Sequence, residues 1–240
     1  MDKKVVITGA TSGIGWALAR ELHARGCVVG GTGRRVERLD MLKEELDERI
    51  FIQYMDVTRE QEAFGHLDSL IEQMGGMDIM VLNAGVSNFR GSSDWEVEKR
   101  VIDVNVQGFS ALANYSFDYF EERGHGHIVG ISSIASLFGY GLSATYNASK
   151  AYVSTYLQGY RQKANHSDAD IAVSDIKPGF VRSEMTDNKE GLFWVASEET
   201  AARQIADAIE KRRNHAYITR RWRLIAWLFK LTPDWILDRM

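Results

Sequence analysis

The sequence predicts a single α/β domain built on a doubly wound parallel sheet. Short, continuously apolar runs alternate with longer segments of helical periodicity, and no Pro-rich or Gly/Ser-rich linker interrupts this alternation. Strands that are apolar throughout suit a sheet covered on both faces, and helix-length connections make neighbouring strands parallel. The 240 residues are 45% hydrophobic and 26% charged, which is an ordinary globular composition and excludes a disordered chain.

The sequence predicts strands that alternate with helices along the chain. The strand-forming runs are residues 5–7, 27–29, 51–54, 79–82, 128–131, 171–176 and 216–218. The helical segments are residues 14–25, 36–47, 59–73, 94–106, 107–122, 146–163 and 198–212. Two helix starts carry a capping-box pattern, in which a hydroxyl and a side chain three residues later satisfy free amide donors: Thr58 with Gln61, and Ser93 with Glu96.

Charge is distributed unevenly along the chain. The formal net charge of −4 gives no reason to expect a nucleic-acid partner. Residues 211–240 hold eight Lys/Arg and two Asp/Glu, a net of +6, which leaves −10 for residues 1–210. The same tail contains three of the six Trp.

The cysteine content and the N-terminal sequence indicate a reducing compartment. Cys27 is the only cysteine, so no intrachain disulfide forms, and no Cys or His cluster near it suggests a metal site. The first residues lead directly into an apolar strand without the apolar segment and cleavage site of a signal peptide. The apolar run 224–229 is far shorter than the ~20 residues that span a bilayer. We therefore expect a cytoplasmic protein without a metal.

A glycine-rich segment, Thr8-Gly-Ala-Thr-Ser-Gly-Ile-Gly15, joins the first strand to the first helix. Glycines here let the backbone turn tightly and approach a pyrophosphate, whose charge is favoured by the free amides at the helix start. A plain glycine-rich turn has the same composition, but the position between first strand and first helix favours a dinucleotide site. The expected cofactor contacts are Gly9, Thr11, Ser12, Gly13, Ile14 and Gly15.

The end of the second strand predicts which dinucleotide binds. A carboxylate about 20 positions past the glycines bonds the ribose 2′-hydroxyl of NAD, whereas a basic residue accommodates the 2′-phosphate of NADP. The sequence has Arg34 and Arg35 there and no carboxylate. Guanidinium groups donate bidentate, charge-assisted bonds to phosphate. We therefore expect NADP rather than NAD, the alternative being two solvated arginines that begin a helix.

Two further strand ends carry candidate cofactor contacts. Asp56 and Val57 follow the third strand, and Asn83, Ala84 and Gly85 follow the fourth. Ligands of open α/β sheets bind at the carboxyl ends of strands. Asp and Asn are also common turn formers, so each pair alone is a weak signal.

Tyr146 and Lys150 form the pattern most directly connected with chemistry. Their spacing of four places both on one face of a helix. A tyrosine with a pKa near ~10 is a poor acid or base at neutral pH, but a neighbouring ammonium, helped by an oxidised nicotinamide, favours the phenolate. Ser132 and Ser133 end the fifth strand. By itself, a Tyr and Lys four residues apart is usually a surface accident.

Taken together and in this order, the motifs resemble the short-chain dehydrogenase/reductase family. They are Thr8-Gly-x-x-x-Gly-Ile-Gly15, Asn83-Ala-Gly85, Asn105, Ser133 and Tyr146-x-x-x-Lys150. Ser133, thirteen residues before Tyr146, fits the family spacing better than Ser132 does. The resemblance covers about residues 3–219 and implies a Rossmann-type sheet of seven strands in the order 3-2-1-4-5-6-7. Residues 1–219 would form the dehydrogenase domain, and residues 220–240 a helical extension outside the family pattern.

The resemblance also implies a role for each matching residue. Tyr146 would donate or accept the proton, and Ser133 would hydrogen-bond the substrate oxygen. Lys150 would bind the nicotinamide ribose and lower the pKa of Tyr146, and Asn105 would hold a water in a proton relay with Lys150. Further cofactor contacts would come from the segment after the sixth strand, namely Pro178, Gly179, Val181 and Ser183.

Two positions depart from the family pattern. Many NADP-dependent relatives carry a basic residue immediately before the second glycine of the first motif, where this chain has Ser12. Ser183 stands where Thr is usual but keeps a hydroxyl for the nicotinamide carboxamide.

The segment 184–197 corresponds to the substrate lid of the family, and apolar residues in and near it predict an apolar pocket. The candidates are Phe138, Tyr140, Phe180, Met185, Leu192, Phe193 and Trp194. Such pockets favour lipophilic carbonyls or alcohols, although the same residues could simply pack the lid.

The apolar residues of two predicted helices could form either a subunit interface or part of the core. In relatives, the helices corresponding to 107–122 and 146–163 build a two-fold dimer face, so we expect a homodimer or homotetramer. The sequence leaves open whether the apolar residues there form that interface or ordinary core: Phe109, Leu112, Ala113, Phe117, Phe120, Ala151 and Thr155.

The basic, Trp-rich tail 220–240 leaves alternatives open. It suits an interfacial helix on anionic lipid, a subunit-contacting arm, or a flap that covers the pocket with Trp222 and Trp227. The main hypothesis is an NADP-dependent reductase or dehydrogenase acting on a small carbonyl or alcohol. The alternatives are a non-catalytic NADP sensor or scaffold, and a peripheral membrane dehydrogenase that serves lipid- or steroid-type substrates.

Overall fold

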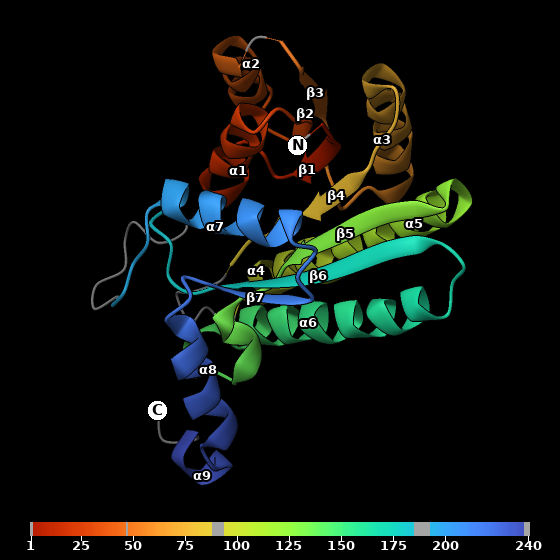
Figure 1. Cartoon of the computed structure of the whole chain (residues 1–240). Helices are drawn as coiled ribbons and strands as arrows, with labels where there is room; N and C mark the ends of the chain where they lie inside the picture. Colours follow the sequence, from red (N-terminus) through yellow and green to blue (C-terminus); the bar gives the residue numbers. More distant parts are fainter. Residues whose placement is uncertain (1, 47, 88–93, 185–192, 238–240) are drawn as a thin grey trace.

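The computed structural model describes residues 2–46, 48–87, 94–184 and 193–237 (Figure 1). The strands form one parallel sheet in the order β3-β2-β1-β4-β5-β6-β7, which confirms the predicted order. Their bounds are β1 (Lys4–Thr8), β2 (Val28–Gly33), β3 (Ile50–Tyr54), β4 (Ile79–Leu82), β5 (His125–Ile131), β6 (Asp170–Pro178) and β7 (His215–Ile218).

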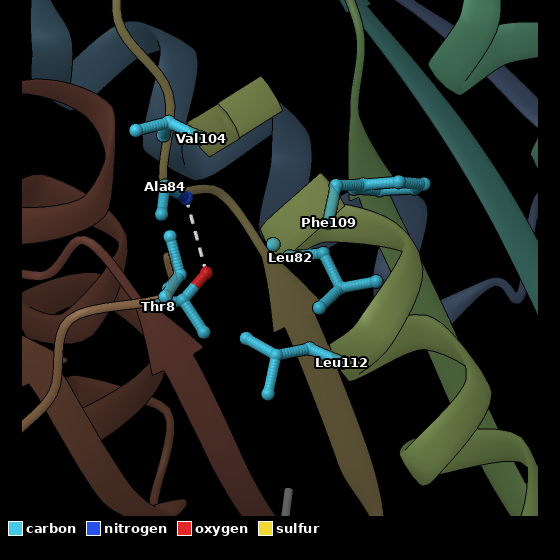
Figure 2. A pocket seen from close by; sticks show the side chains of 8 residues that line it. Thr8, Leu82, Ala84, Val104, Phe109 and Leu112 are labelled. Carbon is cyan, nitrogen blue, oxygen red and sulfur yellow. Dashed lines mark hydrogen bonds between the residues drawn. The ribbon is translucent and has the colours of Figure 1, made fainter. Parts of the chain in front are cut away.

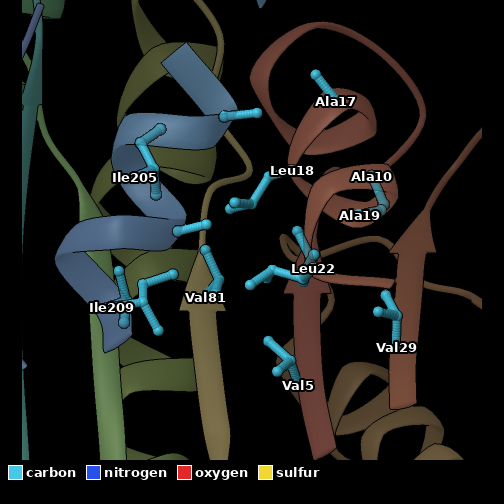
Figure 3. Packing of buried hydrophobic residues seen from close by; sticks show 14 of the residues in the cluster. Val5, Ala10, Ala17, Leu18, Ala19, Leu22, Val29, Val81, Ile205 and Ile209 are labelled. Carbon is cyan, nitrogen blue, oxygen red and sulfur yellow. The ribbon is translucent and has the colours of Figure 1, made fainter. Parts of the chain in front are cut away.

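Helices cover both faces of the sheet, as the apolar strands require. On one face lie α1 (Gly13–Ala24), α2 (Val36–Leu46) and α7 (Glu198–Glu210). Figure 3 shows Leu18 and Leu22 of α1 meeting Ile205 and Ile209 of α7 over the strands, where Val81 is also buried. The other face carries α3 (Glu60–Met74), α5 (Phe109–Arg123) and α6 (Ala144–Asn165).

β2 ends at Gly33, four residues beyond the end of the predicted run 27–29. Three of these four residues are glycines, which interrupt the apolar pattern on which the prediction depended. A Cβ on Gly30 would lie 2.5 Å from the Sδ of Met74, so the close packing of α3 on this strand requires glycine there. The strand therefore continues to Gly33 and delivers Arg34 and Arg35 to the edge of the sheet.

The question of core or interface is settled for α5. Five of its apolar residues are buried on the sheet face that α3, α5 and α6 cover, among residues of β4, β5 and α6: Phe109, Leu112, Ala113, Phe117 and Phe120. These residues therefore form core within one chain. Ala151 is half-buried and Thr155 is exposed on α6. The oligomeric state stays a prediction.

The segment predicted as two helices, 94–106 and 107–122, is one continuous rod. α4 (Trp95–Ile102) passes through a π-helical turn, η1 (Asp103–Gly108), into α5. A Cβ on Gly108 would lie 2.5 Å from the carbonyl oxygen of Val57, so glycine allows the rod to approach the end of β3 closely. The π turn contains Asn105, in keeping with the frequent occurrence of such turns at functional sites.

The two helices have other N-caps than the predicted Thr58 and Ser93. Thr58 donates its hydroxyl to Asp56 Oδ1 (2.8 Å), and α3 begins only at Glu60, because the carboxylate of Asp56 satisfies the Thr58 amide as well. At α4 the N-cap is Asp94, whose side chain accepts from the amide of Glu96 (3.0 Å). Ser93 lies outside the described residues.

The end of the chain folds against the body. Two short 3₁₀ turns, η2 (Ile134–Leu137) and η3 (Gly141–Ser143), link β5 to α6. α8 (Trp222–Leu231) packs on η2, and α9 (Asp234–Leu237) follows it. No helix among the described residues combines the length and apolarity needed to cross a bilayer.

Candidate active site

The carboxyl ends of β1 and β4 are tied together by the Thr8 hydroxyl. Its Oγ1 accepts hydrogen bonds from the amides of Asn83 and Ala84, each at 3.0 Å. Figure 2 shows the bond from Ala84. The Asn83 side chain donates in return to the carbonyls of Thr8 (3.0 Å) and Gly9 (3.1 Å). Asn83 therefore fixes the glycine-rich turn. The cavity in Figure 2 has a volume of about 10 Å³, room for at most one water, and is not a substrate site.

The glycine-rich turn has the close backbone approach that a dinucleotide requires. Gly9 and Gly13 have φ values of +69° and +58°, a region that side chains disfavour. A Cβ on Gly15 would lie 2.2 Å from the carbonyl oxygen of Gly9. Ser12, the N-cap of α1, makes no side-chain capping hydrogen bond. The local structure thus fits a pyrophosphate at the start of α1. Ile14 packs against the core cluster of that face.

Arginines gather beside this turn. Arg35 donates to Thr11 Oγ1 from Nε (3.2 Å), to the hydroxyl of Ser12, and to Glu184 Oε2 (2.8 Å). Glu184 also lies 3.9 Å from Arg38, a residue that the sequence analysis did not single out. The hydrogen bond from Arg35 holds the pKa of Glu184 below its ordinary value.

Arg34 turns toward the end of β3 instead. Its guanidinium lies 3.9 Å from Asp56 Oδ2. Val57 is buried beside Asp56 and lines the cavity of Figure 2. The two arginines predicted as a pair therefore have different partners, and Arg35 is the one at the glycine-rich turn.

Ser133 and Tyr146 are brought together at the end of β5. A side-chain hydrogen bond joins them, and both residues are buried. Ser133 is the N-cap of η2 and accepts from the amide of Ala135 (3.1 Å), which fixes its hydroxyl oxygen. Ser132 points elsewhere and donates to Asp175 Oδ1. The two adjacent serines thus have different partners, and Ser133 is the one beside Tyr146.

Lys150 and Asn105 flank Gly85. A Cβ on Gly85 would lie 3.3 Å from Lys150 Nζ and 3.4 Å from Asn105 Oδ1. Lys150 Nζ donates to the carbonyl of Ile131 (3.0 Å). Asn105 exchanges two hydrogen bonds with the backbone of Val86, both at 2.9 Å. The four predicted catalytic residues therefore meet near the ends of β4 and β5.

Hydrogen bonds in the first turns of α6 fix the position of this helix relative to Asn105. Asn105 Nδ2 donates to Ser149 Oγ (3.0 Å), and Ser149 donates to the carbonyl of Tyr146 (2.7 Å). At the start of the helix, Asn147 donates to the carbonyl of Phe138 (2.9 Å). These bonds fix the orientation of the helix that carries Tyr146 and Lys150.

Burial shifts both titratable groups of the site toward their neutral forms. It raises the pKa of the Tyr146 hydroxyl, while the hydrogen bond with Ser133 lowers it. Burial lowers the pKa of Lys150 to about 8, and the negative charge of Asp175 opposes that shift. Burial, opposed by the hydrogen bond with Ser133, therefore sets the direction of the Tyr146 pKa shift in this structure, and the effect expected from Lys150 stays a prediction.

A buried ionic network is centred on Asp175, whose charge acts on Lys150. No motif in the sequence pointed to this network. Asp175, fully buried on β6, pairs with Lys177 and accepts from Ser132 and Ser154. Burial raises the pKa of Asp175, but His215, Lys177 and Ser132 outweigh this and hold the pKa well below its ordinary value. The available signal was an Asp and a Lys two positions apart in an apolar strand, which places both on one face.

The end of β6 and the segment that follows it lie beside both Ser133 and the glycine-rich turn. Pro178 accepts a long hydrogen bond (3.5 Å) from Ser133 Oγ, and Val181 is buried in an isolated bridge with Ala196. A Cβ on Gly13 would lie 3.6 Å from Cβ of Ser183, so Ser183 is next to the glycine-rich turn. A Cβ on Gly179 would lie 2.0 Å from Trp222 Nε1, which shows how closely the tail packs here.

An aromatic cluster lies over this segment. Phe180 contacts Phe193 and Trp222, with ring centres 5.9 and 5.3 Å apart, and Trp194 lies 6.0 Å from Trp222. Trp222 comes from the tail and was named in the alternative in which the tail is a flap over the pocket. Phe138 instead stacks on Phe229 of α8, and Tyr140 is exposed. Met185 and Leu192 lie outside the described residues.

Comparison with known proteins assigns the fold and these motifs to a family. The family model described as short chain dehydrogenase matches residues 3–191, so the chain belongs to the short-chain dehydrogenase/reductase family. An uncharacterized oxidoreductase of Myxococcus xanthus is 35% identical over 189 residues, 77% of this chain and 74% of that one. The NADP-dependent 3-hydroxy acid dehydrogenase YdfG of Escherichia coli O6:H1 is 35% identical over 183 residues, 74% and 72% of the two chains.

Solved structures agree with the fold. A serine dehydrogenase complexed with NADP+ superposes with a TM-score of 0.79 at 25% identity, covering 89% of this chain and 93% of that one. A short-chain dehydrogenase from Burkholderia phymatum in complex with NAD reaches 0.86 at 21% identity, covering 95% and 92%, and shows the fold alone. The chain is thus an oxidoreductase of this family, and these comparisons support a nicotinamide cofactor.

Proposed function

We propose that the protein reduces a small apolar carbonyl compound with NADPH, or oxidises the corresponding alcohol with NADP+, using Tyr146 as general acid and base. The observation that carries this proposal is the meeting of Ser133, Tyr146, Lys150 and Asn105 beside Gly85, at the sheet edge that also holds the glycine-rich turn. A binding protein would need the turn but not this set of proton-handling groups.

The residues of the site divide the chemistry between them. When bound, the nicotinamide supplies or accepts the hydride. In the reductive direction, Ser133 donates a hydrogen bond to the carbonyl oxygen and Tyr146 gives that oxygen its proton as negative charge develops there. Since burial raises the pKa of Tyr146, its hydroxyl is protonated at neutral pH and ready to donate. Lys150 would bind the nicotinamide ribose, and Asn105 would hold a water in the proton relay with Lys150.

NADP is favoured over NAD by the position of Arg35. Its guanidinium donates hydrogen bonds to the side chains of Thr11 and Ser12 in the glycine-rich turn, where it would bind the 2′-phosphate of NADP. Arg34 and Arg38 add positive charge to this edge. Arg35 Nη1 donates a hydrogen bond to Glu184 in this structure. A bound 2′-phosphate would compete with Glu184 for the guanidinium.

An apolar substrate is favoured by the aromatic cluster after β6. Phe180, Phe193 and Trp194 meet there, and Trp222 closes the cluster from the tail. Such walls discriminate between apolar substrates weakly, by about 1–3 kcal/mol per methylene. We therefore expect activity toward several lipophilic ketones or aldehydes rather than one.

The experiment that tests the proposal is a screen of NADPH oxidation, followed at its absorbance band, over ketones, aldehydes, steroids and sugars. We expect turnover with apolar carbonyl compounds and slower turnover when NADH replaces NADPH. Tight NADPH binding without turnover of any carbonyl compound, or of any alcohol with NADP+, would favour the non-catalytic sensor instead.

A further inference from the structure

The C-terminal helix α8 is anchored to the body by one apolar face. Trp222 and Ala226 are buried against Ile134 of η2. Phe229 stacks on Phe138, with ring centres 4.3 Å apart. These contacts fix how the helix is rotated about its axis. Figure 1 shows α8 and α9, in dark blue, extending away from the sheet.

The opposite side of α8 is also apolar, and it faces solvent. Leu224, Trp227, Leu228 and Leu231, here called the outer apolar face, are between 60% and 77% exposed. At about 100° per residue they lie on one side of the helix, opposite Trp222. Trp235 of α9 is 60% exposed as well. Soluble proteins rarely expose such an apolar surface unless it contacts a partner.

The charged residues of α8 and of the two positions before it are all positive. Residues 220–231 contain three Arg and one Lys and no carboxylate. Arg220, Arg221 and Arg223 are exposed. Residues 1–210, by contrast, have a net charge of −10. The positive charge is therefore concentrated on the same segment as the exposed apolar side chains.

We propose that the outer apolar face, with Arg220, Arg221 and Arg223, docks on the surface of an anionic lipid bilayer. Trp and Leu side chains enter the headgroup boundary while arginines bind lipid phosphates, which is the usual composition of a helix lying in the interface. A ten-residue helix lies on such a surface and does not span it.

Lipid fits this surface better than a second copy of the chain. A two-fold contact through α8 would bring the arginines of both copies together, and the segment contains no carboxylate to neutralise them. A bilayer of anionic lipid supplies both the apolar layer and the negative charge. It would also repel the acidic body, which leaves α8 as the contacting element.

Docking in this way has a consequence for the candidate site. The inner face of α8 packs on Ile134, immediately after Ser133, so the substrate side of the site would lie next to the bilayer. This consequence rests on the proposed function, whereas the docking itself does not and is tested without any measurement of activity.

The test is co-sedimentation of the full chain with vesicles of phosphatidylcholine, with and without phosphatidylglycerol. We expect binding to the anionic vesicles that weakens as salt is added, and little binding to phosphatidylcholine alone. The double variant Trp227→Glu/Leu228→Glu should bind at least about tenfold more weakly. Arg221→Glu/Arg223→Glu should lose at least about tenfold, since each cation near an anionic surface contributes about 1 kcal/mol.

Matched controls separate docking from misfolding. Met41→Glu on α2 changes an exposed apolar side chain at the other end of the sheet and should bind vesicles like the unchanged protein. Circular dichroism should show all variants folded, because the altered residues are exposed. Failure of the unchanged protein to sediment, or equal binding by the Trp227→Glu/Leu228→Glu variant, would overturn the proposal. So would an oligomer that this variant dissociates in the absence of vesicle binding.

Discussion

The ammonium of Lys150 lies 5.8 Å from the centre of the Tyr146 ring. Both side chains are buried, and burial moves their pKa values in opposite directions, up for the phenol and down to about 8 for the ammonium. At neutral pH the protein therefore holds a neutral tyrosine beside a charged lysine. This pair is prepared to donate a proton, which suits carbonyl reduction.

The pH dependence of reduction should report Lys150. As pH rises through about 8, Lys150 loses its charge in the free enzyme, and kcat/KM for reduction should fall. In Lys150→Arg the cation persists to much higher pH, so the fall near pH 8 should vanish even if activity is lower. Initial rates across a pH series test this, with Lys163→Arg as the control. A fall near pH 8 that persists in Lys150→Arg would assign it to another group.

Arg35 should determine the preference for NADPH. Removal of a charge-assisted bond worth about 1.5–3 kcal/mol in Arg35→Ala should raise KM for NADPH by roughly 10- to 100-fold and leave KM for NADH little changed. Glu184→Gln should act in the opposite direction, because it frees the Arg35 guanidinium. Arg20→Ala, an exposed arginine paired with Glu45, is the control. Equal effects on both cofactors would contradict an Arg35 contact with the 2′-phosphate.

The buried pair of Asp175 and Lys177 should matter for folding. Asp175→Ala leaves a buried ammonium without its partner, which typically costs about 3–5 kcal/mol of unfolding free energy. Asp118→Ala removes an exposed partner of Lys163 and should cost less than about 1 kcal/mol. Urea unfolding of the two variants measures the difference. Similar losses in both would show that the network contributes little.

His127 should make the protein less stable in acid. It is buried on β5 beside the hydroxyl of Ser174 (2.8 Å), and burial lowers its pKa to about 3. Below the unfolded value of about 6.5 the unfolded chain binds a proton that the folded chain does not, so stability falls by up to about 1.4 kcal/mol per pH unit. His127→Gln should flatten the stability profile between pH 6.5 and 3, relative to the same series for His166→Gln. An unchanged slope would refute this assignment.

The positions of the strands and of the motifs could be predicted because they depend on local patterns, whereas the strand order was predicted from the family resemblance. Apolar runs fix which residues become strands, and the carboxyl ends of β1, β4 and β5 then gather Gly9, Asn83 and Ser133. The boundaries were less predictable where a tertiary contact decides them. β2 continues through glycines that α3 requires, and α4 joins α5 through a π turn packed on Val57.

The features that the sequence left open or did not predict come from long-range packing. A flap with Trp222 was one of three alternatives for the tail, and Trp222 reaches Gly179 and Phe180 only because α8 folds back onto η2. Asp175 acquires its importance from Lys177 and from Ser132, which follows the neighbouring strand β5 directly. The two helices have other N-caps than predicted because nearby carboxylates, Asp56 and Asp94, competed for the same amides.

Tyr146→Phe tests the central claim most directly. The substitution removes one hydroxyl from a buried ring and leaves the glycine-rich turn and Arg35 in place. With a carbonyl substrate found in the screen, kcat should fall by about 10²- to 10⁴-fold, while NADPH binding, followed by its fluorescence, should change little. Tyr54→Phe, an exposed ring on β3, should retain full activity. Full turnover by Tyr146→Phe would show that another group carries the proton and would contradict the proposed mechanism.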